Sequence, residues 1–97
     1  MNITIELQEF KNICRDMSEL GAAQYVRKTK PSADMMSQRE AYKMFGESRV
    51  KRWVASGMVK AMRNGETQRS KLLYSMAEMM AVDAGERLQP IVARNLR

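Results

Sequence analysis

The apolar positions of residues 5–29 recur three and four residues apart, with charged residues between them. This spacing predicts an amphipathic helix. A heptad-like subset of these positions covers residues 3, 7, 10, 14, 17 and 21, about two and a half repeats, which is too short a run to predict a coiled coil. The subset is either a dimer seam or the face that packs on the rest of the domain. Cys14 lies on it and is expected to be a small buried side chain. Pro31 ends the helix, because proline disfavours helical geometry in the residue before it, and residues 30–36 form a connector.

Two later helices are predicted to begin at capping boxes, in which a serine and a glutamate three residues apart satisfy the first backbone N–H groups. Ser37 and Glu40 begin a helix over 38–45, which Gly46 ends. Ser75 and Glu78 begin a helix over 76–84, which Gly85 ends.

A further helix is predicted between them, over residues 48–56. Val50, Trp53 and Val54 share one side of it, so the only tryptophan of the chain should face the core while the basic residues beside it face outward. Apolar runs on both sides of Asn64-Gly65 then indicate a β-hairpin with arms at 58–63 and 69–74.

At 97 residues the chain is long enough for one domain with an additional helix. The expected fold is mainly α with a small β-hairpin. The expected organisation is an N-terminal amphipathic helix at 1–30, a connector at 31–36, a helix–turn–helix with a hairpin at 37–85 and a C-terminal tail at 86–97. The tail contains Pro90 and is expected to be a short helix or a frayed end.

The positive charge is concentrated in the middle of the chain. The net charge is +6, and residues 36–75 carry nine bases against three acids, while the two flanking segments are each balanced. A concentrated positive field is typical of a protein that binds a polyanion, although a solvated basic face has the same composition.

Other function classes have little support in the composition. The chain has no histidine and one cysteine, so no disulfide framework or Cys/His zinc site is expected. No catalytic constellation or glycine-rich phosphate loop is present, and we expect neither an enzyme nor a cofactor, metal or small-molecule substrate. Neither a membrane-spanning segment nor a secretory signal is predicted. A cytoplasmic, nucleoid-associated bacterial protein is the expectation.

Residues 36–79, MSQREAYKMFGESRVKRWVASGMVKAMRNGETQRSKLLYSMAEM, combine these features: a serine-led helix, a glycine break, a second helix ending RWVASGMV, a hairpin with Asn-Gly and a serine-capped helix. This segment resembles the winged helix-turn-helix of the MerR-like regulators and of the excisionases of phages and mobile elements. The resemblance implies DNA binding in transcription regulation or DNA recombination, beside an integrase or a promoter. The helix at 5–29 is not part of that module. A MerR-type regulator carries its sensor region after the module, and too few residues follow residue 79 here to form one.

In such families the positions of Ser48, Arg49 and Arg52 face DNA, together with residues of the wing. The side chains expected to contact DNA in this chain are Arg39, Lys43, Ser48, Arg49, Lys51, Arg52, Arg63, Arg69 and Lys71. Arginine can donate two hydrogen bonds to guanine in the major groove. The alternative for Arg49 and Arg52 is that they are solvated or pair with Glu47 or Glu66.

The predicted function is therefore sequence-preferring binding of double-stranded DNA, as an excisionase-like accessory factor or a small regulator of a phage or mobile element. A homodimer or a cooperative array, and an integrase or another mobile-element protein, are the possible protein partners. The alternative is a protein-interaction adaptor that uses the N-terminal helix and the tail and does not bind DNA.

Overall fold

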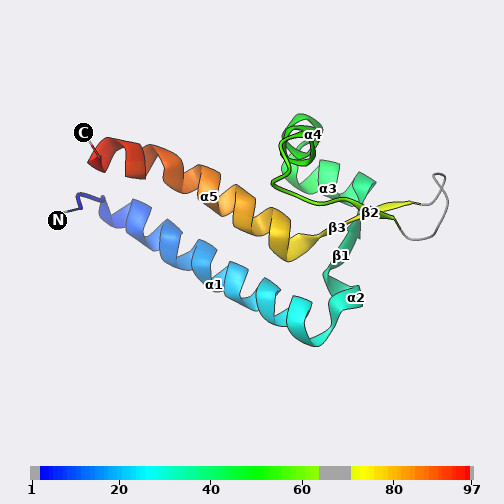
Figure 1. The fold of residues 1–97 in the computed structure, drawn as a ribbon. Helices are drawn as coiled ribbons and strands as arrows, with labels where there is room; N and C mark the ends of the chain where they lie inside the picture. Colours follow the sequence, from blue (N-terminus) through cyan, green and yellow to red (C-terminus); the bar gives the residue numbers. More distant parts are fainter. Residues whose placement is uncertain (1–2, 64–70, 97) are drawn as a thin grey trace.

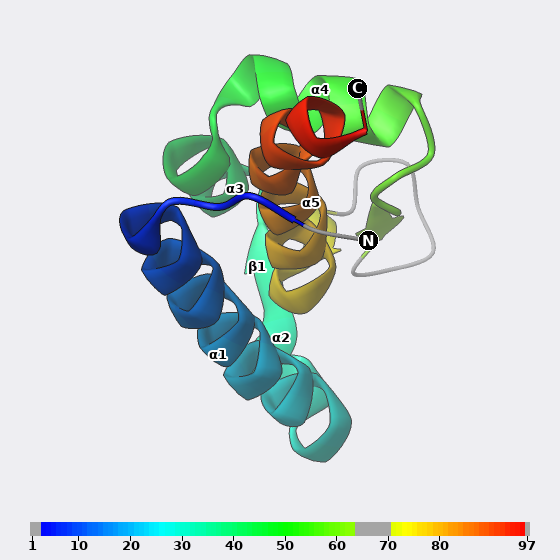
Figure 2. The same cartoon turned by 90° about the vertical axis from the view of Figure 1, so that its left-hand side faces the viewer.

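The computed structural model describes residues 3–63 and 71–96, which form a mainly helical structure with one small sheet (Figure 1). The elements are α1 (Leu7–Thr29), α2 (Pro31–Asp34), β1 (Met35–Ser37), α3 (Gln38–Phe45), α4 (Glu47–Ala55), β2 (Met62–Arg63), β3 (Leu72–Ser75) and α5 (Met76–Asn95). The helices α1 and α5 lie side by side and run in opposite directions, and α5 lies between α1 and α4 in both views (Figures 1 and 2). No helix within the described residues is both long enough and apolar enough to cross a bilayer.

The sheet has three antiparallel strands in the order β1-β3-β2. The pairing of Met62 with Leu73 joins β2 to β3, so a hairpin forms, but β2 covers only the end of the arm predicted at 58–63 and β3 begins only at Leu72. The Asn64-Gly65 turn lies outside the described residues. On the other side of β3, Met36 of β1 pairs with Tyr74. This third strand falls at the end of the predicted connector, where a run of three residues was too short to give a strand pattern.

The core lies where the sheet, α3, α4 and the start of α5 meet. Trp53 is fully buried, and the Phe45 ring packs edge-on against its indole with 5.7 Å between ring centroids. The residues of the buried apolar cluster are Met36, Ala41, Phe45, Val50, Trp53, Val59, Tyr74 and Met79. The expectation that the tryptophan faces inward is confirmed.

Local sequence signals set several of the helix ends. The hydroxyl oxygens of Ser37 and Ser75 accept hydrogen bonds from the backbone N–H groups of Glu40 and Glu78, as an N-cap requires. The Glu78 carboxylate does not complete a capping box, because its Oε1 accepts from the backbone N–H of Lys60 at 2.6 Å. Gly46 separates α3 from α4 with a φ of 96°, a conformation that other residues rarely adopt.

The helix α5 is much longer than predicted. It continues through Gly85 and Pro90 to Asn95, so the predicted end at residue 84 is wrong. A glycine inside a helix costs only ~1 kcal/mol relative to alanine, which tertiary contacts can offset. Arg87 and Arg94, on either side of Pro90, form ion pairs with α1 that hold this part of α5 in place.

The helix α1 turns a different side towards α5 than its apolar pattern predicted. Asp16, expected on the polar side, is buried and lies 3.5 Å from Arg87 of α5. Glu9, also expected on the polar side, forms an ion pair with Arg94 at 3.0 Å. Cys14 is exposed rather than buried. The ion pairs with α5 therefore set the rotation of α1 about its axis.

Two glycine substitutions should change stability in opposite directions. We expect Gly46→Ala to lower the free energy of unfolding by about 1–3 kcal/mol, because φ is positive there although the added methyl group would meet only the Arg49 side chain, at an ordinary contact distance of 4.0 Å. We expect Gly85→Ala to raise it by about 0.5–1 kcal/mol, because residue 85 lies inside a helix with open space around it. Urea denaturation followed by Trp53 fluorescence measures both. A destabilising Gly85→Ala variant would contradict the continuous helix.

Candidate nucleic-acid interface

The helix α4 has a buried side and an exposed side. Val50 and Trp53 are fully buried, and Ser48, Lys51 and Ala55 are exposed. Since neighbouring helix positions differ in direction by ~100°, these two sets of residues lie on different sides of the helix. The core therefore holds α4 by its apolar side and leaves a polar side open to solvent.

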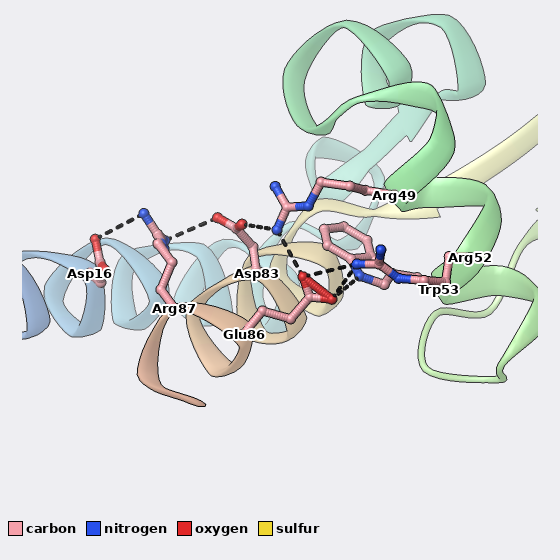
Figure 3. Close-up of polar contacts among 7 residues, drawn as sticks. All are labelled: Asp16, Arg49, Arg52, Trp53, Asp83, Glu86 and Arg87. Atoms are coloured by element: carbon pink, nitrogen blue, oxygen red, sulfur yellow. Dashed lines mark hydrogen bonds and ion pairs between the residues drawn. The ribbon is translucent and has the colours of Figure 1, made fainter. Parts of the chain in front are cut away.

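The indole N–H of Trp53 is satisfied by the next helix. Its Nε1 donates to Oε1 of Glu86 on α5 at 2.7 Å (Figure 3). A buried indole needs a partner for this N–H, because leaving it without one costs ~1–3 kcal/mol. Glu86 thus joins α5 to the middle of the core.

The same carboxylates of α5 hold the two arginines of α4. Nη2 of Arg49 donates to Oδ1 of Asp83 at 2.6 Å and to Oε2 of Glu86 at 3.0 Å. Nη2 of Arg52 donates to Oε1 of Glu86 at 2.8 Å. The Arg49 guanidinium also lies over the indole of Trp53, 4.8 Å from the ring centroid. Figure 3 shows both arginines and Trp53 converging on Glu86.

These contacts change the interpretation of Arg49 and Arg52. The sequence led us to expect both guanidinium groups to project towards a ligand, with Glu47 or Glu66 as the alternative partners. Instead both donate to α5. The Arg49 side chain is 36% exposed and the Arg52 side chain is 62% exposed, so Arg52 retains more open surface.

The network continues from α4 across α5 to α1. Arg87 of α5 pairs with Asp83 at 3.0 Å and with the buried Asp16 of α1 at 3.5 Å. A chain of alternating charges therefore runs from Arg52 through Glu86, Arg49, Asp83 and Arg87 to Asp16 (Figure 3). Because members of such a network hold each other in position, it couples the orientation of α4 to that of α1.

The network also shifts the pKa values of its members. Hydrogen bonds from Trp53 and Arg49, followed by that from Arg52, lower the pKa of Glu86 from 4.5 to about 2. Hydrogen bonds to Asp83 and then Glu86 raise the pKa of Arg49 above its ordinary value. Both shifts favour the charged forms, as expected for opposite charges in contact.

The other residues predicted to contact DNA lie on several elements. Lys51 of α4 is exposed, pairs with Glu47 one turn earlier at 2.9 Å and lies 6.0 Å from the ring centroid of Tyr42 on α3. The remaining candidates among the described residues are also exposed, apart from the partly covered Arg49: Arg39 and Lys43 on α3, Ser48 on α4, Arg63 on β2 and Lys71 just before β3. Arg69 lies outside the described residues.

Asp83 and Glu86 were not predicted as part of the site. They are three residues apart and face the same helix, but the predicted helix end at residue 84 separated them. Treating Gly85 as a helix-interior residue would have placed both carboxylates on one side of α5. In the part of the chain that the structure describes, no group of three or more His, Cys, Asp or Glu side chains could hold a metal ion.

The charge of Glu86 should make the free energy of unfolding depend on pH below pH 4.5. Its pKa in the folded protein, about 2, is below the ordinary 4.5, so its stabilisation is complete above pH 4.5 and is lost as the pH falls towards 2. Glu86→Gln removes the charge but keeps an acceptor for Trp53. We expect the stability difference between the parent and this variant to be largest near neutral pH and to narrow below pH 4.5.

Urea denaturation at a series of pH values measures this difference. Glu19→Gln, at an exposed position of α1, is the matched control for the loss of one carboxylate. If the difference in free energy of unfolding between the parent and Glu86→Gln stays constant down to pH 2, the ion pairs of Glu86 do not stabilise the fold.

Comparison of this chain with protein-family models, with curated protein sequences and with solved structures finds no match in any of the three. A proposal for the function therefore has to be based on the sequence and on the geometry of the described residues.

Proposed function

We propose that this protein binds double-stranded DNA, with α3 and α4 as a helix-turn-helix and the β2–β3 hairpin as its wing. The observation that carries the proposal is the division of α4 into two sides. Val50 and Trp53 fix the helix in the core, while Ser48 and Lys51 remain exposed near its N-terminal end. In a helix-turn-helix, the N-terminal residues of the second helix are the ones that reach the base edges in the major groove.

The charge around this helix supports a polyanionic ligand. Residues 36–75 carry the whole +6 excess of the chain. The α5 carboxylates Asp83 and Glu86 offset two of the nine cations in this segment. Lysines and arginines exposed on α3, α4 and the hairpin would contact phosphates, which supply the salt-dependent part of DNA affinity.

The two arginines of α4 have different roles in this proposal. Arg49 donates to two carboxylates and lies on the Trp53 ring, so it holds α4 against α5 and does not read a base. Arg52 is more exposed and uses Nη2 for Glu86, and a guanidinium has further N–H groups to offer an acceptor in the groove. Ser48, Lys51 and Arg52 are therefore the proposed contacts from α4.

The biological setting follows from the resemblance of residues 36–79 to the MerR-like and excisionase modules. The proposed role is an accessory factor of recombination or a small regulator in a phage or mobile element, acting in the bacterial cytoplasm. A basic wing that reaches phosphates, with Arg63 on β2 and Lys71 just before β3, fits both roles.

One observation favours a second candidate, a protein-interaction adaptor that does not bind DNA. Arg49 and Arg52, expected to read bases, donate instead to α5, and α1 exposes a row of large apolar side chains. An adaptor would use such a surface and would need no cationic face.

DNA titrations at several salt concentrations separate the two candidates. For the parent, we expect the logarithm of the binding constant for a random duplex to fall linearly with the logarithm of the salt concentration. Each phosphate contact contributes a slope of about −0.9, so Lys51→Ala combined with Lys71→Ala should make the slope shallower by about 2. Fluorescence anisotropy with a labelled duplex measures the slope.

The matched control is Arg15→Ala combined with Lys28→Ala, which removes two exposed cations from α1. This variant should keep the slope of the parent. An absence of salt-sensitive binding by the parent would exclude DNA binding and leave the adaptor. An equal loss of slope in both variants would mean that the affinity comes from net charge and not from the helix-turn-helix.

A further inference from the structure

The helix α1 carries two lengthwise rows of residues, and one of them makes the ion pairs with α5. That row pairs Glu9 with Arg94, Asp16 with Arg87 and Arg27 with Glu78, which fixes an antiparallel register along the whole of α1. Half-buried Ile13 and Leu20 lie between these charges.

The second row consists of Leu7, Phe10, Cys14 and Met17 and remains in solvent. Leu7 is 69% exposed, Phe10 54% and Met17 40%, and Cys14 is also exposed. At ~100° per residue, this row lies about a third of a turn from the side that faces α5. It is also the heptad-like part of the sequence, with spacings of three, four and three.

We propose that this row is the interface with a second copy of the same chain, and that the two α1 helices pair in parallel as a short two-stranded coiled coil. Leu7 and Cys14 then occupy heptad positions a, and Phe10 and Met17 occupy positions d. Ile3 precedes the helix and takes no part in the heptad. Gly21 continues the row without a side chain, so the seam is limited to the N-terminal half of α1.

The charge beside the row favours a parallel pairing. Lys11 is exposed and lies at an e position next to the row. In a parallel pair the e positions of the two helices lie on opposite sides of the seam, so the two Lys11 side chains stay apart. An antiparallel pairing centred on this row would bring the two Lys11 side chains together.

The area is sufficient for a specific dimer of modest affinity. Four side chains with about half of their surface open offer on the order of 300–400 Å² of apolar surface per copy. With the flanking polar residues, the two copies together would bury roughly 1,000–1,200 Å², at the lower end of specific interfaces. We therefore expect a dimer that dissociates on dilution.

Parallel pairing has a consequence for DNA that depends on the proposed function. The sheet, α3 and the start of α5 lie near the end of α1 opposite to the chain termini (Figure 1). A parallel seam therefore brings the two helix-turn-helix units to the same end of the dimer, as binding to two half-sites requires. The pairing itself does not require DNA.

Sedimentation of the full chain over a range of micromolar concentrations, without DNA, tests the pairing. We expect the parent to approach twice its monomer mass of 11.2 kDa at high concentration. Leu7→Glu combined with Phe10→Glu should raise the dissociation constant at least tenfold and keep the melting temperature, because both side chains are exposed in the monomer. The control is Met58→Glu, an apolar-to-acidic change at a position that is 57% exposed and lies outside α1.

A parent that stays monomeric throughout the range would overturn the proposal, as would a double variant that dimerises like the parent. Because these measurements contain no DNA, their failure would leave the proposed DNA binding intact, and a failed DNA titration would leave the dimer intact.

Cys14 tests the direction of the pairing. In a parallel seam the two Cys14 side chains face each other at one a layer, and a mild oxidant should link them in a disulfide with loss of two electrons and two protons. In an antiparallel seam Cys14 faces Phe10 of the other copy, and no link should form. Cys14→Ser is the control on denaturing gels. A reversible dimer that gives no covalent product would overturn the parallel arrangement.

Discussion

The hydrogen bond from the indole of Trp53 to Glu86 is the interaction on which the arrangement of the helices depends. Trp53 is fully buried in the core, and its N–H must have an acceptor. That acceptor stands one residue beyond Gly85, so α5 has to continue past a glycine to supply it. Once Glu86 is in place, its negative charge also attracts the two guanidinium groups on the same helix as the indole.

The contacts of α5 extend along most of its length. At its start, the buried Asp34 accepts from the backbone N–H of Ala77 at 2.9 Å and from the hydroxyl of Ser75, where a negative charge also suits the helix dipole. In its middle, Asp83 and Glu86 hold α4. Near its end, Arg94 pairs with Glu9 of α1. This distribution explains why neither Gly85 nor Pro90 ends the helix, because tertiary contacts on both sides outweigh the local propensities.

The sequence predicts those features of the fold that arise from local chemistry. The N-caps at Ser37 and Ser75 and the glycine break at Gly46 act through the backbone of their own segment. The inward orientation of Trp53 follows from helix periodicity. These signals were sufficient to predict α3 and, to within one residue at each end, α4, whereas the hairpin was predicted with longer arms than it has.

Features that depend on distant partners could not be predicted in this way. The rotation of α1 is set by Arg87 and Arg94, more than seventy residues from the acids that they contact. The contacts of Arg49 depend on the length of α5, which we underestimated because Gly85 and Pro90 are local signals for the end of a helix. For the candidate site, the sequence therefore predicted α4 and its amphipathic character. It did not predict which basic side chains of α4 form ion pairs within the protein.

The charges of the chain divide it into a neutral part and a cationic part. Residues 1–35 and 76–97 each contain equal numbers of acids and bases, and several of these charges pair between α1 and α5. The pair of antiparallel helices α1 and α5 is thus close to neutral. Little charge repulsion would therefore oppose the proposed contact between two copies along the apolar row of α1. The cationic excess remains on α3, α4 and the β2–β3 hairpin, and the carboxylates of α5 neutralise it only where α4 packs on them. The exposed apolar row of α1 and the cationic excess of residues 36–75 therefore lie on different parts of the chain.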